Sequence, residues 1–261
     1  MGRPSRYNSD FMNPSLAIAR RFGAASQRYD EHSPIQRQVA KQLAARIHAA
    51  RLPTSLMALE LGCGTGHLTR HLVPTLGGCW IASDLAQPMA RLCGQTLSGV
   101  QPLVMDGQRP AIAPQSLDLI CANLTVQWFT DLPGSLARLT NLLRPGGLLA
   151  FSTLGLGTFA EWIACYRAEN LVPSTLGFLD AGRWCDAFPK NGELRHEEEV
   201  ILDQPGNALE FLRRLRTIGA DTPAPGHRPL TAGELRRVAK RFDDAGALVS
   251  YRVFYGLWRK P

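Results

Sequence analysis

The chain has 261 residues, enough for one large domain, or one domain with a small attachment, to bury a core without disulfides or metals. This length excludes a mini-protein scaffold. With 45% hydrophobic and 20% charged residues, the composition is ordinary for a globular protein and does not favour disorder. The net charge of +7 is uneven: residues 1–51 carry nine Lys/Arg and three Asp/Glu, residues 52–204 nine and fourteen, and residues 205–261 eleven and five. Such basic ends fit nucleic acid, an acidic protein or a small anionic substrate.

Six cysteines, at positions 63, 79, 93, 121, 165 and 185, have apolar or Gly-rich neighbours and no spacing typical of a metal site. We therefore expect buried free thiols and no bound metal. The first ten residues are polar, and no window reaches ~18 apolar residues. These features predict a soluble, cytoplasmic protein that does not bind a membrane.

Two helices are predicted before Pro53. From Pro34 to Ala50, four apolar residues recur every four positions and form one stripe on a helix: Ile35, Val39, Leu43 and Ile47. A shorter helical segment covers Pro14 to Tyr29.

After Pro53, short β-rich runs alternate with helical stretches. The predicted strands are Leu56–Leu61, Cys79–Ser83, Gln101–Met105, Leu117–Ala122 and Leu148–Thr153, and the predicted helices end at about Thr75 and Leu97 or span Asp131–Leu143 and Thr158–Asn170. This alternation predicts a doubly wound, mostly parallel sheet. We expect an exposed edge strand at Leu194–Leu202, helices at Ala208–Thr217 and Thr231–Asp244, and a last strand at Ala247–Leu257.

A glycine-rich motif, Glu60-Leu-Gly-Cys-Gly-Thr-Gly66, lies between the first strand and its helix. Its glycines allow a sharp turn and the close approach of a ligand, and the helix start offers free N–H groups. The motif predicts a nucleotide-type ligand. A purely structural turn and a dinucleotide site are the alternatives, although the spacing here is G-x-G-x-G, with an acidic residue two positions before the first glycine.

Three polar residues follow later strands. Asp84 ends the second strand, 18 residues after Gly66, where a carboxylate can accept hydrogen bonds from both ribose hydroxyls of an adenosine. Asp106 can accept a hydrogen bond from an adenine amino group, or it can fix its own turn. Asn123 lies beside the reactive end of such a ligand, or it only caps its strand.

The glycine motif, Asp84, Asp106 and the turn Leu143-Arg-Pro-Gly-Gly-Leu-Leu149 together resemble the class I S-adenosylmethionine-dependent methyltransferases. The resemblance implies an α/β fold with a Rossmann-like, seven-stranded, mostly parallel sheet whose last strand is antiparallel. It also implies S-adenosyl-L-methionine as cofactor and S-adenosyl-L-homocysteine as product. The cofactor contacts that it assigns are Glu60, Gly62, Gly64, Gly66, Asp84, Leu85, Asp106, Gly107 and Asn123.

A narrower resemblance is carried by Phe22-Gly-Ala-Ala-Ser-Gln-Arg-Tyr29 with Gln36, Asn123-Leu-Thr-Val-Gln-Trp128, Phe151-Ser-Thr-Leu154 with Gly157, and Leu215-Arg-Thr-Ile-Gly-Ala220. These segments are similar to the malonyl-acyl-carrier-protein O-methyltransferases of biotin synthesis. That family methylates the free carboxyl group of a malonyl thioester on the carrier's phosphopantetheine arm. The resemblance implies a helical lid over residues 1–53 and a methyltransferase domain over 54–261, with a helical insertion at about 204–246. We place Tyr29 and Asn123 at the catalytic centre and Trp128 at the substrate. Tyr29 closes the site from the lid, or it only packs that lid. Residues 171–193 match no motif.

The chemistry needs little acid or base help. A carboxylate has a reference pKa near ~4 and is already ionised at neutral pH, so no general base is required. A cation can orient it, and Arg213 and Arg216 lie three apart on one predicted helical face, with Arg214 turned away. We expect Arg213 or Arg216 to hold the malonyl carboxylate, unless this is a solvated basic face. Because carrier proteins are acidic, all three arginines are also candidates for carrier docking.

Three other functions remain open at this point. A free diacid could replace the carrier substrate, as in methyltransferases that resemble those for trans-aconitate. RNA is a weaker candidate, because the sequence after the fourth strand is Asn123-Leu-Thr-Val and lacks a base-methylation motif. A binding module without activity is also weaker, because the motif glycines and Asp84 are all present. We therefore expect an acidic acyl-carrier protein as the partner, and no nucleic acid.

Overall fold

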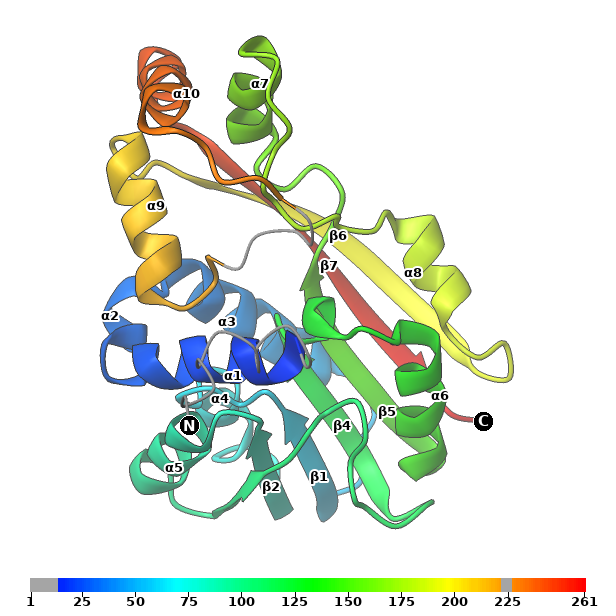
Figure 1. Cartoon of the computed structure of the whole chain (residues 1–261). Coiled ribbons are helices and arrows are strands. Elements are labelled where there is room, and N and C mark those ends of the chain that lie inside the picture. Colours follow the sequence, from blue (N-terminus) through cyan, green and yellow to red (C-terminus); the bar gives the residue numbers. More distant parts are fainter. Residues whose placement is uncertain (1–13, 222–226) are drawn as a thin grey trace, which may run out of the picture.

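The computed structural model describes residues 14–221 and 227–261, so the first thirteen residues of the predicted lid and residues 222–226 of the predicted insertion lie outside the described residues. A seven-stranded sheet with the order β3-β2-β1-β4-β5-β7-β6 forms the centre of the fold (Figure 1). Its strands are β1 Leu56–Leu61, β2 Gly78–Asp84, β3 Val100–Val104, β4 Leu117–Asn123, β5 Leu143–Leu154, β6 Glu193–Asp203 and β7 Val249–Arg259. Strands β1 to β5 are parallel, and β7 is antiparallel to both β5 and β6. The predicted α/β sheet with an antiparallel last strand is confirmed.

Helices cover both faces of this sheet. They are α1 Pro14–Ala25, α2 Tyr29–His32, α3 Pro34–Ala49, α4 Thr69–Leu72, α5 Gln87–Thr96, α6 Leu132–Leu142, α7 Ala160–Ala168, α8 Ala181–Ala187, α9 Ala208–Thr217 and α10 Ala232–Asp244, with 3-10 turns η2 Ser26–Arg28 and η3 Val126–Trp128. The predicted stripe on α3 is confirmed, because its four residues are buried against the sheet. On the opposite face, Leu136 and Leu139 of α6 and Trp184 of α8 pack against β4, β5 and β7.

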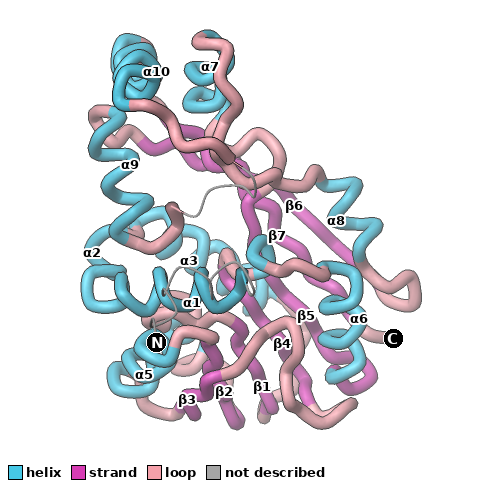
Figure 2. The backbone as a smooth tube through the Cα atoms, viewed as in Figure 1, coloured by secondary structure: helices cyan, strands magenta, loops and turns pink. Residues whose placement is uncertain are grey.

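Helices α7, α9 and α10 gather beyond the carboxyl ends of β4 and β5 (Figure 2). Aromatic rings join them: Trp162 of α7 lies 5.5 Å from Phe211 of α9 and 5.2 Å from Phe242 of α10, measured between ring centroids. Because α9 and α10 come from the segment between β6 and β7, the insertion folds back over the end of the sheet where ligands of such folds bind.

Strand β6 is the edge strand that the sequence predicts. Its pairing partner is β7 alone, and most of its residues are exposed. Three consecutive glutamates, Glu197 to Glu199, lie in this strand, and charge on an edge opposes pairing with other chains.

Two predicted elements differ in extent. The helix after the glycine motif is only the four residues of α4, because short-range bonds such as His71 N–H to Leu68 C=O interrupt the helical pattern. Strand β5 begins at Leu143, before the expected turn. Its residues 144–147 bulge away from β4, and Gly146 and Gly147 instead pair with Lys260 beyond β7.

The sequence did not predict α8, and the prediction that all six cysteines are buried is wrong for two of them. Asp180 caps α8 by accepting a hydrogen bond from the N–H of Arg183, a local signal that the prediction did not use. Cys79 is exposed and Cys185 is partly exposed, whereas the other four cysteines are buried.

Within residues 14–221 and 227–261, no helix is long and apolar enough to cross a membrane, and no cluster of His, Cys, Asp and Glu could hold a metal ion.

Candidate functional site

Two cavities meet at the carboxyl ends of the parallel strands. The inner cavity lies between the sheet and α1 and is lined by Ser15, Ile18, Ala19, Phe22, Tyr29, Gly62, Gly64, Asp84, Leu85, Met89, Met105, Asp106, Gly107, Gln108, Asn123, Leu124, Thr125, Trp128 and Phe129. The outer cavity lies beneath α7 and α9 and shares Phe22, Tyr29, Leu124 and Trp128 with the inner one. These four shared residues form a neck, at which two ligands could meet and exchange a group.

The glycine turn lies at the base of the inner cavity. Gly62 and Gly64 have φ angles of +62° and +54°, which side chains rarely adopt. A Cβ atom on Gly62 would lie 2.3 Å from Oγ1 of Thr125, whereas one on Gly64 would point toward the ring of Tyr29, 4.0 Å away. The turn therefore packs tightly against Thr125, just after β4, and presents bare backbone at Gly64 to the cavity, as a close-fitting ligand requires.

Asp84 joins β2 to this turn. Its Oδ2 accepts a hydrogen bond from the N–H of Gly64 at 2.9 Å, and its Oδ1 accepts one from the N–H of Ala86 at 2.8 Å. Burial raises the pKa of the carboxyl group, while these two N–H groups lower it. The carboxylate is thus held rigidly at the wall of the cavity.

Asp106 fixes its own turn, since its Oδ1 accepts a hydrogen bond from the N–H of Gln108 at 2.9 Å. Its Oδ2 has no hydrogen bond within the described residues and remains available to a ligand. Gln108 was not predicted as a site residue, although it directly follows the predicted pair Asp106 and Gly107 and lines the same cavity. Its side chain accepts a hydrogen bond from the N–H of Thr130 at 2.7 Å and donates one to Ser15 at 3.3 Å, which ties this wall to α1.

Glu60 and Gly66 do not line the inner cavity. The carboxyl group of Glu60 is buried below the turn and accepts a hydrogen bond from Thr69 at 2.6 Å, and burial raises its pKa well above the usual range. A Cβ atom on Gly66 would lie 2.6 Å from Leu97 of the segment after α5. In this structure, both residues support the turn from behind.

The segment predicted to be a lid is attached directly to the glycine turn. Asp30 of α2 accepts a short hydrogen bond from Thr65 and lies 3.4 Å from the guanidinium group of Arg70. Ser33 and His67 are hydrogen-bonded at 2.8 Å, and burial lowers the pKa of His67 to about 4, so its imidazole is neutral at pH 7. These contacts hold the glycine turn against α2 and the start of α3.

Of the two predicted catalytic residues, Tyr29 belongs to the neck, and Asn123 lines the inner cavity next to Leu124 of the neck. The ring of Tyr29 packs 5.7 Å from His67, and burial, together with Asp84 and Asp30, raises the pKa of its hydroxyl group. Tyr29 is therefore a neutral hydrogen-bond donor. Asn123 donates a hydrogen bond to the backbone oxygen of Gln36 at 3.1 Å and accepts one from Ser152, so it joins α3 to the end of β4.

The outer cavity is mostly apolar and aromatic. Its residues are Phe22, Tyr29, Gln36, Leu124, Gln127, Trp128, Leu154, Phe159, Trp162, Ser174, Thr175, Leu176, Phe178, Phe211, Leu212, Leu215, Ile218, Ala220, Asp221 and Tyr251. No Lys, Arg or His is among these described lining residues. Gln36 and Gln127 were not predicted as site residues, although both belong to segments that carry the family resemblance. The amide of Gln127 is bonded to Leu124 and Thr153, whereas that of Gln36 makes no hydrogen bond within the described residues.

The three predicted substrate arginines lie outside both cavities. Arg213 pairs with Glu210 at 2.6 Å, and Arg214 pairs with Glu210 and Asp203. Arg216 is 84% exposed and lies 3.6 Å from Asp221. Their contact with the substrate carboxylate stays a prediction, and these ion pairs do not support it. Helical spacing identifies the face that the arginines share, but not the acidic residues that lie beside them.

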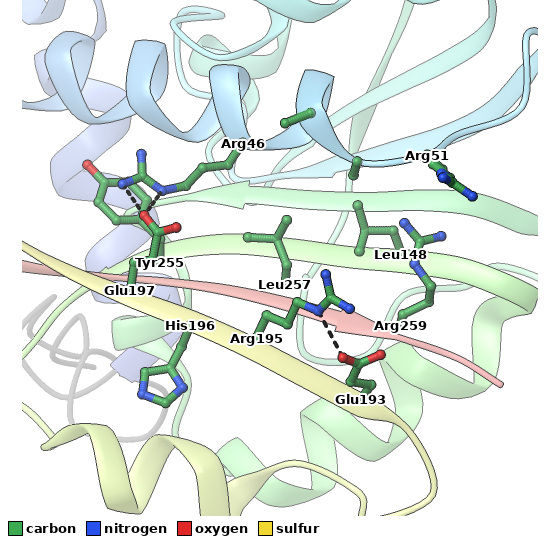
Figure 3. A pocket seen from close by; sticks show the side chains of 12 residues that line it. Arg46, Arg51, Leu148, Glu193, Arg195, His196, Glu197, Tyr255, Leu257 and Arg259 are labelled. Atoms are coloured by element: carbon green, nitrogen blue, oxygen red, sulfur yellow. Dashed lines mark hydrogen bonds and ion pairs between the residues drawn. The ribbon is translucent and has the colours of Figure 1, made fainter.

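A wider groove of about 770 Å³ lies on the sheet between α3 and strands β5, β7 and β6 (Figure 3). Two of its arginines are paired with acidic residues of β6: Arg46 with Glu197 at 2.7 Å and Arg195 with Glu193 at 2.8 Å. Arg51, just before β1, marks the amino ends of the parallel strands. Ligands of doubly wound sheets bind at the carboxyl ends, so the groove is not the candidate active site.

Comparisons with known proteins show the family of this chain. Residues 59–151 match the methyltransferase domain family. Over 255 residues, the chain is 36% identical to the malonyl-acyl-carrier-protein O-methyltransferase of Magnetococcus marinus, covering 95% of this chain and 94% of that protein. The chain belongs to the malonyl-acyl-carrier-protein O-methyltransferase family.

Both resemblances expected from the sequence are thereby confirmed. This chain is also 44% identical, over 251 residues, to the biotin biosynthesis bifunctional protein BioCD of Bordetella avium. The matched part spans 53% of that protein's length. The solved structure of YcgJ protein from Bacillus subtilis aligns with 84% of this chain and 98% of its own, with a TM-score of 0.61 and 13% identity, and shows the shared class I methyltransferase fold.

Proposed function

We propose that the protein transfers a methyl group from S-adenosyl-L-methionine to the free carboxylate of a malonyl thioester on acyl-carrier protein. The product is the malonyl methyl ester that primes biotin synthesis. The observation that carries this proposal is the aromatic neck between a glycine-based cavity that contains two aspartates and an outer cavity without cations among its described residues.

The inner cavity fits the cofactor. Asp84 offers a carboxylate for the ribose hydroxyls, Oδ2 of Asp106 is free for the adenine amino group, and the bare backbone of Gly62 and Gly64 lies on the methionine side. Leu85 and Gly107 complete the walls. When bound there, S-adenosyl-L-methionine supplies an electrophilic methyl group on a sulfonium sulfur.

The residues of the neck, together with Gln36 of the outer cavity, orient the carboxylate and exclude water. The hydroxyl of Tyr29 and the amide of Gln36 can each donate a hydrogen bond to one carboxylate oxygen. Neutral donors leave more electron density on the attacking oxygen than a two-pronged arginine would. Phe22 packs edge-on against Trp128, with ring centroids 5.7 Å apart, and shields this point from solvent. Such fixed proximity supplies several kcal/mol of the barrier.

The outer cavity favours a thioester over a free diacid. A free diacid would bring a further carboxylate, and trans-aconitate, which has three carboxyl groups, would bring two, into a space whose described lining has no positive side chain. Burying an unpaired charge is costly. A malonyl thioester carries one carboxylate at the tip of an arm that is neutral near the thioester. The apolar lining of Leu215, Phe178 and Trp162 suits such an arm.

The carrier itself must meet the enzyme outside the outer cavity. The positive charge of residues 1–51 and 205–261 complements an acidic carrier and should accelerate association. We therefore expect kcat/KM for malonyl-carrier to fall steeply as the salt concentration rises.

An initial-rate comparison tests the function. The enzyme is incubated with labelled S-adenosyl-L-methionine and either malonyl-carrier protein or a panel of free diacids, and base-labile methyl ester is counted. The proposal requires the carrier substrate to have the highest kcat/KM. A free diacid that is methylated faster would overturn it.

A further inference from the structure

The lid and the insertion meet at a seam between α1 and α9. Gly219, just after α9, approaches the backbone of α1 so closely that a Cβ atom there would lie 2.9 Å from the carbonyl carbon of Arg21. The guanidinium group of Arg21 also pairs with Asp221 at 2.8 Å, across 200 residues of sequence. The seam is therefore a built contact between the two basic ends of the chain.

The seam has an apolar inner side and a basic outer side. Phe22, Leu215 and Ile218 face the outer cavity, whereas their sequence neighbours line a notch of about 300 Å³ on the surface. The notch residues are Arg21, Ala24, Ala25, Gln27, Arg28, Arg216 and Thr217. A ligand in the notch is thus separated from the outer cavity by only the thickness of this contact.

The notch has spare positive charge. Arg21 and Arg216 both face the single carboxylate of Asp221, at 2.8 and 3.6 Å. Arg28 is exposed and has no acidic partner within the described residues. Exposed ion pairs contribute only ~0–1 kcal/mol, so these arginines can turn toward an incoming anion at little cost.

We infer that this notch docks the acyl-carrier protein, an inference that rests on the proposed function. Arg28 and Arg216 contact the acidic surface around the attachment point of the arm, together with the phosphate at the root of the arm. Arginine suits both groups because its guanidinium binds carboxylate and phosphate through two parallel hydrogen bonds. The apolar face of the same seam then receives the arm.

The groove in Figure 3 is the competing basic surface. It holds four arginines, but two of them are paired with glutamates, and it lies at the far end of α3 from Gln36. Since α3 has 16 residues, the two ends are about 24 Å apart, well beyond the Debye length of ~8 Å in physiological salt. Arg51 in this groove therefore provides a matched control for charge reversal.

The test compares Arg28→Glu, the double variant Arg28→Glu/Arg216→Glu and the control Arg51→Glu in the full chain. Methyl ester formation is measured with malonyl-carrier protein, malonyl-phosphopantetheine and malonyl-pantetheine, and binding of S-adenosyl-L-homocysteine reports whether each variant is folded. For malonyl-carrier, we expect kcat/KM to fall about 10-fold in the single and about 100-fold in the double variant, as for close charge pairs across an interface. The loss in kcat/KM should be smaller for malonyl-phosphopantetheine and smallest for malonyl-pantetheine. In the control Arg51→Glu, kcat/KM should stay within about twofold of the unaltered protein for all three substrates.

Three outcomes would overturn the docking site. The first is carrier turnover in the double variant equal to that of the unaltered protein, and the second is an equal loss in Arg51→Glu. The third is a loss in kcat/KM for malonyl-pantetheine as large as that for malonyl-carrier, with cofactor binding intact. That result would indicate that Arg216 binds the malonyl carboxylate instead of the carrier. If the unaltered protein esterifies no malonyl thioester, the proposed function itself fails and the docking site fails with it.

Discussion

Replacing Asp84 with asparagine should weaken cofactor binding while leaving the protein folded. The carboxylate is held by the N–H groups of Gly64 and Ala86, at 2.9 and 2.8 Å, so both of its oxygens are oriented before a ligand arrives. Hydrogen bonds to a charged acceptor contribute ~1.5–3 kcal/mol each. An asparagine amide keeps one oxygen but presents an NH₂ group in place of the other. Losing one strong bond and weakening the second costs about 3 kcal/mol, which corresponds to about 100-fold in Kd.

The same substitution has opposing effects on stability. The amide loses one hydrogen bond to the backbone, but it also removes a carboxylate whose burial raises its pKa and therefore costs free energy when ionised. We expect the free energy of unfolding without cofactor to change by less than about 1 kcal/mol. Binding and folding therefore respond differently to this change.

Calorimetric titration with S-adenosyl-L-homocysteine measures the Kd, and denaturant unfolding measures the stability. Asp106→Asn is the matched control. It should weaken binding by only about 10-fold, because Oδ2 of Asp106 makes at most one ligand contact. A Kd for Asp84→Asn within about threefold of the unaltered value would refute the assignment of Asp84 to the ribose.

Three further changes probe the turn, the lid and the neck. Gly62→Ala should destabilise the protein by about 3 kcal/mol in denaturant unfolding, because it adds a clash with Thr125 to a positive φ; Thr125→Gly should recover part of this loss, and no recovery would contradict the packing argument. His67 has a folded pKa of about 4, below its unfolded value, so the stability it contributes is present above about pH 6.5 and is lost as the pH falls toward 4. His67→Gln should make the unfolding free energy less dependent on pH in that window, and an unchanged slope would refute the buried neutral imidazole. Gln36→Glu should lower kcat/KM for malonyl-carrier at least ~10-fold more than Gln36→Leu, with cofactor Kd unchanged, and equal losses would remove Gln36 from the carboxylate site.

Local patterns in the sequence were enough to predict the sheet and its main helices. The four-residue recurrence from Ile35 to Ile47 leads directly to the buried face of α3, and the glutamates of β6 indicate an edge. The turn at Gly62 and the carboxylates Asp84 and Asp106 follow consecutive parallel strands, whose carboxyl ends necessarily meet at one edge of a sheet.

Contacts between distant segments were not predictable in this way. Spacing along α9 shows that Arg213 and Arg216 share a helical face, but not that Glu210 and Asp221 lie beside them. The seam between Arg21 and Gly219 depends on how two segments about 200 residues apart pack, which periodicity does not encode. Charge counts identified the basic ends of the chain, whereas only the fold brings them together.

The proposed reaction is decided by where one methyl group goes. Malonyl-carrier protein is incubated with the enzyme and S-adenosyl-L-methionine, and intact and fragment masses of the carrier are recorded before and after mild base. We expect one added methyl group on the terminal carboxyl of the malonyl arm, removed by base and formed together with an equal amount of S-adenosyl-L-homocysteine. A methyl group on a carrier side chain, or no transfer to malonyl-carrier by an enzyme that binds the cofactor, would contradict it.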